Sequence, residues 1–150
     1  MKLNERCEML INDGYGYVLP GDLIAEEDIE IDIYPCLIVK GNVRTTKSIH
    51  ATGGLIADGD ITAGREIIVC RELEALGSIE AGWDIKAEWE IKAGGDIKTR
   101  CDILSCDSIL ADGEIEACEI ETYGDIECAT IKANSIKALF GSVTIKKERS

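Results

Sequence analysis

The sequence has few aromatic residues, few prolines and no long apolar run. Aromatic side chains make up 5% of the 150 residues, and there are 2 prolines and 1 histidine. No stretch is long and apolar enough to span a bilayer as a helix. The N-terminal residues lack the basic and then apolar layout of a signal peptide. We therefore expect a cytoplasmic protein.

Basic residues are also scarce compared with acidic ones. The chain carries 16 Lys and Arg against 29 Asp and Glu, which gives a formal net charge of −13 and a pI near 4.4. Such a charge repels phosphate backbones and anionic membrane surfaces, and it attracts basic proteins. We expect no direct contact with nucleic acid or with a membrane, and a basic protein as the partner.

The cysteines show neither a disulfide framework nor a zinc-binding pattern. There are 7 of them, an odd number, and no two have the C-x2-C spacing that is common in zinc sites. Reduced thiols in a reducing compartment fit this pattern better than disulfides. Cys101 and Cys118 are expected to stack, and Cys128 is expected in the core. No metal or cofactor is predicted.

What the sequence does contain is a six-residue repeat. An aliphatic residue recurs at every sixth position from Val43 to Ile115, and a small residue follows two places later in most repeats. A helix would need apolar residues at i, i+3, i+4 and i+7, so the spacing excludes helix for most of the chain. The order large-in, polar-out, small-in is the alternation of a half-buried strand. Each hexad therefore predicts one short strand and one bend.

A second period, of eighteen residues, indicates how many hexads close one coil. Glycine recurs at this spacing from Gly41 to Gly113, always two places before the inward aliphatic. Three hexads per coil predict an all-β, single-stranded parallel β-helix, a triangular β-solenoid of about 18 residues per coil. We expect the glycine row to mark the corner where the backbone bends hardest or takes positive φ.

The hexads also suggest the winding of the helix and the boundaries within it. Parallel crossovers are right-handed in the great majority of cases, so we expect right-handed winding, although strict hexads also occur in left-handed helices. Residues 1–28 do not follow the repeat and are interpreted as an N-terminal cap, residues 29–145 as coils, and residues 146–150 as a charged end that discourages end-to-end growth. Ile31 and Leu37 already share the phase of Val43. After Ile115 the spacing falls, which predicts shorter coils.

The candidate functional residues lie on the predicted face that carries Ile67, Ile85 and Ile103. Acids precede these aliphatics, further aliphatics point outward, and a tryptophan occupies a corner. Protein interfaces are anchored by aromatic and apolar residues within a charged rim. Solubility alone is the other explanation of the acids, whose stacking costs stability. Trp89 and Leu110 on the adjacent face either extend this patch or, for Trp89, cap a corner. The predicted partner-binding residues are Glu66, Ile68, Trp83, Asp84, Asp102, Leu104 and Glu119.

The sequence offers little support for an enzyme. Hexapeptide acyltransferases use a coil histidine as general base, but they carry substrate loops that interrupt the hexads, and this chain has none. His50 is therefore expected to be a surface histidine. There is no nucleophile motif and no phosphate-binding loop, so no catalytic residue is predicted.

Three strands carry a resemblance to a known family. The segments Gly59–Ala63 (GDITA), Gly95–Thr99 (GDIKT) and Gly124–Glu127 (GDIE) resemble the recurring Gly-Asp-Ile/Val strands of bactofilins. This resemblance implies a triangular right-handed β-helix and a cytoskeletal protein that polymerises through the ends of the helix.

Two functions follow as hypotheses. The first is a non-catalytic, acidic protein-binding solenoid, an inhibitor of the bacterial toxin-immunity type that docks on a basic enzyme such as a nuclease toxin. The second is a bactofilin-like scaffold that self-assembles into homo-oligomers. An acyltransferase is a distant third hypothesis.

Overall fold

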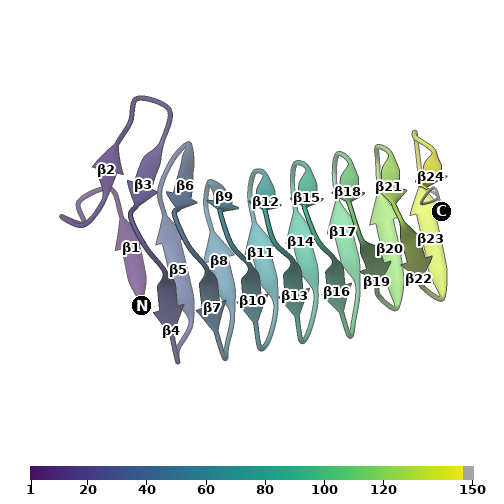
Figure 1. Ribbon diagram of the computed structural model, residues 1–150, viewed down its shortest axis with the longest axis horizontal. Helices are drawn as coiled ribbons and strands as arrows, with labels where there is room; N and C mark the ends of the chain where they lie inside the picture. The colour runs from purple at the N-terminus through teal and green to yellow at the C-terminus, as the bar shows by residue number, and fades with distance from the viewer. Residues whose placement is uncertain (147–150) are drawn as a thin grey trace.

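The computed structural model describes residues 1–146 and is an all-β solenoid (Figure 1). Its twenty-four strands form three sheets, here called A, B and C, and from β3 onward the chain visits the three sheets in turn. Among the described residues no helix is long and apolar enough to cross a membrane. The predicted fold class is confirmed.

The strands of each sheet are given in spatial order. Sheet A comprises β1 (Lys2–Asn4), β5 (Ile29–Asp32), β8 (Ile49–Ala51), β11 (Ile67–Val69), β14 (Ile85–Ala87), β17 (Ile103–Ser105), β20 (Glu119–Thr122) and β23 (Ser135–Ala138). Sheet B comprises β2 (Ile11–Asn12), β3 (Tyr17–Leu19), β6 (Cys36–Val39), β9 (Gly54–Ala57), β12 (Leu73–Ala75), β15 (Ile91–Ala93), β18 (Ile109–Ala111), β21 (Ile126–Cys128) and β24 (Val143–Ile145). Sheet C comprises β4 (Leu23–Ala25), β7 (Val43–Thr45), β10 (Ile61–Ala63), β13 (Ile79–Ala81), β16 (Ile97–Thr99), β19 (Glu114–Glu116) and β22 (Thr130–Lys132).

The register confirms the eighteen-residue coil over the middle of the chain. In sheet C, Val43 pairs with Ile61 and Ile61 pairs with Ile79. Coils shorten toward the C-terminus, as predicted, because Ile120 pairs with Ile136 only sixteen residues later. The first coil is longer than predicted, since Ile29 pairs with Ile49.

That longer first coil corrects the predicted place of Ile31. The hexad phase puts Ile31 in the row of large inward residues, but the structure pairs Ile31 with Ala51, in the row of small ones. Ile29 takes the large position instead, opposite Ile49. Both side chains are still buried, so the insertion changes the row without exposing an apolar residue.

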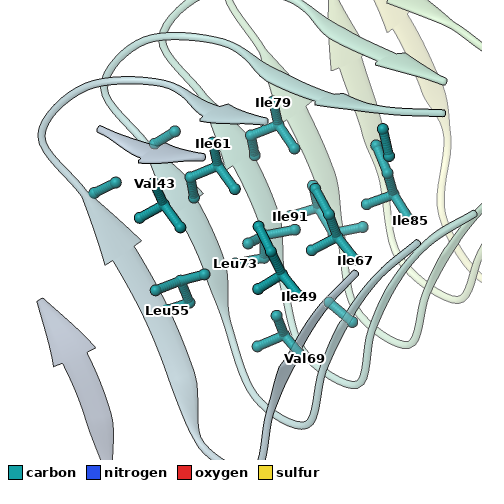
Figure 2. Packing of buried hydrophobic residues seen from close by; sticks show 14 of the residues in the cluster. Val43, Ile49, Leu55, Ile61, Ile67, Val69, Leu73, Ile79, Ile85 and Ile91 are labelled. Atoms are coloured by element: carbon teal, nitrogen blue, oxygen red, sulfur yellow. The ribbon is translucent and has the colours of Figure 1, made fainter. Parts of the chain in front are cut away.

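The core is one continuous aliphatic stack along the axis. From Val43 to Ile115 the large inward residues, such as Ile61 and Ile79, are at most 1% exposed, and the small inward residues that follow them are at most 9% exposed. Figure 2 shows these side chains filling the interior between the sheets. Each coil buries its aliphatics against the coils above and below, as expected of a solenoid. Cys128 is also fully buried, as predicted.

Parallel pairing begins within the segment interpreted as a cap. Strands β1, β3 and β4 pair in parallel with β5, β6 and β7, while β2 pairs antiparallel with β3 in a hairpin. Cys7 and Leu10, between β1 and β2, pack against the core. The inward leucines of this first coil are covered: Leu3, Leu19 and Leu23 are 3%, 7% and 4% exposed.

The glycine row has a steric cause rather than a conformational one. Among residues 1–146 the glycines with positive φ are Gly14 and Gly21. Gly21 lies at the same corner one coil before Gly41, but none of the five row glycines from Gly41 to Gly113 has positive φ. A Cβ at Gly59 would instead overlap the side-chain oxygen of Asn42, and one at Gly77 would overlap that of Asp60. Positive φ, one of the two alternatives considered for this row, is therefore wrong. Glycine is needed at this corner because the side chain of the preceding coil occupies the place of its Cβ.

Those side-chain oxygens form a ladder that links successive coils. Each polar residue just before an inward aliphatic accepts a hydrogen bond from the backbone N–H of its counterpart one coil later, at 2.7–3.1 Å. The ladder satisfies backbone donors at a corner, where no strand partner is available. Its acceptors are Asp22, Asn42, Asp60, Ser78 and Asp96, and the last donor is Glu114.

Candidate protein-binding site

The structure brings the predicted partner-binding residues together along sheet A. Ile68 of β11 pairs with Lys86 of β14, which in turn pairs with Leu104 of β17. The two outward aliphatics are therefore separated by a lysine, and both are half-buried. The seven residues Glu66, Ile68, Trp83, Asp84, Asp102, Leu104 and Glu119 are called the acidic face below.

Asp84 and Asp102 have a structural role that the sequence did not indicate. One oxygen of Asp84 accepts a hydrogen bond from the backbone N–H of Asp102 at 3.0 Å, and Asp102 accepts one from Glu119 at 3.1 Å. Asp84 also lies 3.7 Å from the ammonium of Lys86. These contacts offset the repulsion expected from stacked acids. Replacing either aspartate by lysine would remove an acceptor as well as reverse a charge.

Glu66 is paired with the only histidine of the chain. The Nε2 atom of His50 lies 3.1 Å from Oε1 of Glu66, and the imidazole is 46% exposed. Burial alone would raise the pKa of Glu66, but hydrogen bonds from its own backbone N–H, from His50 and from Ser48 outweigh it and hold this pKa below its usual value. His50 is thus a surface histidine, as predicted, and it stabilises the ionised form of Glu66.

Trp83 is the most exposed apolar residue of the acidic face. Its side chain is 52% exposed, and the guanidinium of Arg65, one coil earlier at the same corner, lies 5.3 Å from the ring centroid. Its backbone carbonyl accepts a hydrogen bond from the hydroxyl of Thr99. The ring is therefore supported by an arginine on the solenoid and still presents surface to solvent.

A groove beside the acidic face was not predicted. It has a volume of about 520 Å³ and runs over strands β1, β5, β8 and β11 at the N-terminal side of Ile68. His50, Thr52 and Asp32 line it, and the hydroxyl of Thr52 donates to Asp32 at 3.0 Å. The hexads could not reveal this groove, because it needs the pairing of β1 with β5 across a connection that does not follow the repeat.

A stack of three side chains at another corner was also missed. The guanidinium of Arg71 lies 4.0 Å from the ring centroid of Trp89 and 5.0 Å from that of Tyr34. The eighteen-residue period places Arg71 and Trp89 on successive coils, so this pair could have been predicted from the sequence. Tyr34 comes from the longer first coil, so the period did not include it. Trp89 does occupy a corner, as one of the two interpretations held.

Within residues 1–146 no group of three or more His, Cys, Asp or Glu side chains is arranged to hold a metal ion. All seven cysteines are free thiols. Cys118 and Cys101 stack as predicted, with the backbone N–H of Cys118 donating to the carbonyl of Cys101 at 2.7 Å. Burial raises the pKa of the Cys128 thiol, which keeps this thiol protonated and unreactive.

Comparison with models of known protein families, with curated proteins and with solved structures finds no match to this chain.

Proposed function

We propose that this chain is a non-catalytic protein-binding solenoid whose acidic face binds a basic protein. The observation that carries the proposal is the half-exposed Trp83 next to the carboxylates of Asp84 and Asp102 on a rigid sheet. Tryptophan is among the residues that contribute most to protein interfaces. A rim of carboxylates steers a basic partner toward it and favours the correct orientation.

The rigidity of the face supports the proposal. Asp84 and Asp102 are held by backbone hydrogen bonds, and Glu66 is held by His50. Side chains that are already ordered lose little conformational entropy when a partner binds, so more of the contact energy appears as affinity.

In its finer form, the proposal is a cytoplasmic inhibitor of the toxin-immunity type, whose target is a basic enzyme such as a nuclease toxin. A small acidic protein can cover the positively charged active site of such an enzyme, because that site is built to bind phosphates. The net charge of −13 on 150 residues is suited to this role.

The test is a pull-down from the native cell lysate followed by calorimetry with the retained protein. We expect one basic protein that is released by salt. The triple variant Trp83→Ser, Asp84→Asn, Asp102→Asn should bind it at least a hundredfold more weakly. Asparagine keeps the hydrogen-bond acceptor, as Asn42 does in the other ladder, so the fold is preserved.

The matched control lies on sheet C, where Glu80 and Glu116 point outward and are exposed. The variant Glu80→Gln, Glu116→Gln removes the same charge and should keep nearly full affinity. Equal losses in the two variants would show that net charge alone drives binding and would refute a specific acidic face.

A second candidate function is a bactofilin-like scaffold that self-assembles, and one observation favours it. The inward residues of the last coil are open to solvent, with Ile136 37% and Val143 43% exposed, and Phe140 beside them is 86% exposed. Strands β22, β23 and β24 each lack a neighbour on one side within the described residues. A second copy could bury this end and pair these edges.

The two ends of the solenoid limit the form of such an assembly. The inward leucines of the N-terminal end are covered, although β1, β2 and β4 are edge strands there. Assembly driven by burial of open inward side chains would therefore use the C-terminal end alone and stop at a pair. Sedimentation velocity distinguishes the outcomes: a dimer that Ile136→Lys dissociates supports assembly through this end. A monomer at all concentrations removes the scaffold as a candidate. Residues 147–150, the larger part of the predicted charged end at 146–150, lie outside the described residues.

A further inference from the structure

The N-terminal half of sheet B carries a column of aliphatic side chains on its outer face. Ile11 pairs with Val18, Val18 pairs with Ile38, and Ile38 pairs with Ile56, on the adjacent strands β2, β3, β6 and β9. Ile11 is 56% exposed, and the other three are half-buried. The column is apolar on four neighbouring strands without interruption.

The repeat does not require aliphatics at this position. In the next two coils the same row holds Glu74 and Lys92, which pair in register. Beyond them a single aliphatic, Leu110, stands between Lys92 and Glu127, so the continuous column ends at Ile56. The outward position of a strand in this sheet therefore accepts charged residues. Because the continuous aliphatic column is restricted to one half of the sheet, packing of the coil does not explain it. Contiguous apolar surface of this kind is typical of binding sites.

Residues beside the column enlarge it and give it the composition of an interface. Leu76 and Tyr34 are each 65% exposed. Tyr34 belongs to the stack with Arg71 and Trp89, and aromatic residues and arginine are enriched at protein interfaces. We call Ile11, Val18, Ile38, Ile56, Tyr34 and Leu76 the sheet B surface.

The charges around the sheet B surface are unbalanced toward negative. Lys40 is paired with Asp58 at 3.7 Å, and Arg71 is paired with Glu72 at 3.6 Å. Within residues 1–146 no ion pair engages Glu74, which lies between Ile56 and Lys92 in the row, or Glu8, which precedes the hairpin. Lys92 offsets one of these two carboxylates. A partner that covers the apolar column would therefore be favoured if its rim were basic.

The spacing of the column distinguishes between the secondary structures that could lie along it. Adjacent strands are about 4.8 Å apart, so this is the interval between successive aliphatics. A helix returns an apolar side chain to one face about every 5.4 Å, whereas an extended strand does so about every 6.7 Å. Over three intervals a helix falls out of step by about 2 Å and a strand by more than 5 Å.

We propose that the sheet B surface binds a basic amphipathic helix of a partner protein, with the apolar stripe of that helix lying along the column. The site is independent of the acidic face, because it lies on a different sheet and uses none of the same residues. Recognition of this kind places side chains at i, i+3, i+4 and i+7 against an apolar surface.

The test uses a synthetic peptide of leucine and lysine whose leucines follow helical spacing, blocked at both ends and monomeric at the concentration used. Calorimetry should detect binding to the intact protein. Two control peptides should fail: one with the same composition in scrambled order, and one in which glutamate replaces lysine.

Protein variants then locate the site. The variant Ile38→Thr, Ile56→Thr keeps β-branched side chains that suit a strand, and it should weaken peptide binding at least tenfold. The matched control Ile24→Thr, Leu139→Thr makes the same kind of change at exposed aliphatics outside both proposed surfaces and should leave binding unchanged.

Each other result would overturn the inference. Binding that survives Ile38→Thr, Ile56→Thr would place the peptide elsewhere, and equal losses in both variants would indicate non-specific attraction to an acidic protein. Tight binding of the scrambled peptide would show that helical geometry is not recognised. The proposed role of the acidic face is tested by its own partner and variants, so the two proposals can fail separately.

Discussion

The two ends of the solenoid differ in how well their inward side chains are covered. At the N-terminal end Leu3, Leu19 and Leu23 are nearly buried, and Cys7 and Leu10 pack against the core. At the C-terminal end the equivalent inward side chains are open to solvent. Figure 1 shows the difference, with the β2–β3 hairpin projecting beyond the first coil and β22 to β24 forming a bare last coil.

Two residues of one inward row show that burial depends on the neighbouring coil. Ile120 and Ile136 pair with each other in sheet A, yet Ile120 is 1% exposed and Ile136 is 37% exposed. The repeat gives both the same local structure. Burial comes from the next coil, so the free energy that an aliphatic contributes depends on whether it has neighbours on both sides.

The largest effect is expected from a charge in the middle of the stack. Ile85→Asp places an unpaired carboxylate in a site with no exposed surface and should cost several kcal/mol, about 4 or more. Circular dichroism should show loss of the β signal. The matched variant Ile136→Asp, at the open end, should cost about 1 kcal/mol or less. Similar losses at both positions would contradict the comparison.

The next effect concerns the cover of the N-terminal end. Leu10→Ser removes an apolar side chain that packs against the first coil, and it should lower the free energy of unfolding by about 1–2 kcal/mol. Phe140→Ser changes a residue that is 86% exposed at the other end and should change it by less than about 0.5 kcal/mol. Urea denaturation measures both. A larger loss for Phe140→Ser would mean that the C-terminal end is covered in solution.

A smaller effect is expected from the ladder. Asp60→Ala leaves the backbone N–H of Ser78 without its acceptor and should cost about 1 kcal/mol. Asp60→Asn should be nearly neutral, because Asn42 and Ser78 fill the same role without charge. Ser142→Ala, in the last coil, should also be nearly neutral, because Ser142 has no described coil above it. If Asp60→Asn costs as much as Asp60→Ala, charge rather than hydrogen bonding holds the corner.

The smallest effect is a dependence on pH. Because the pKa of Glu66 is lowered in the folded state, its contribution is fully present above the unfolded value of about 4.3 and is lost as pH falls through the lower folded value. Thermal unfolding between pH 7 and pH 3 should show a shallower loss of stability for Glu66→Gln than for the unchanged protein. If Glu66→Gln and the unchanged protein lose stability equally as pH falls, the pair with His50 does not stabilise the fold.

The sequence was sufficient to predict most of the fold. The aliphatic row from Val43 to Ile115 is buried, as its six-residue spacing requires, and the eighteen-residue period appears as strand register. The first coil was not predicted correctly, because a two-residue insertion moved Ile31 to the other inward row. No periodic signal marks such an insertion. Right-handed winding stays a prediction.

The site was harder to predict than the fold. The period places Asp84 above Glu66 and below Asp102, but it cannot show that the aspartates accept backbone hydrogen bonds, since that depends on side-chain rotamers at a corner. Positive φ, one of the two causes considered for the glycine row, was wrong for a related reason. A missing Cβ at Gly77 makes room for the side chain of another coil, and backbone conformation alone does not reveal it.

Amide hydrogen exchange on the intact chain tests the difference between the two ends most directly. Backbone amides of β5 and β6, which have a paired strand on each side near the N-terminal end, should exchange almost as slowly as those of β11 and β14 in the middle. Amides of β22, β23 and β24 should exchange fastest, through local opening of a coil with one neighbour. Equal protection of the two ends in the monomer would contradict the open C-terminal coil and the comparison built on it.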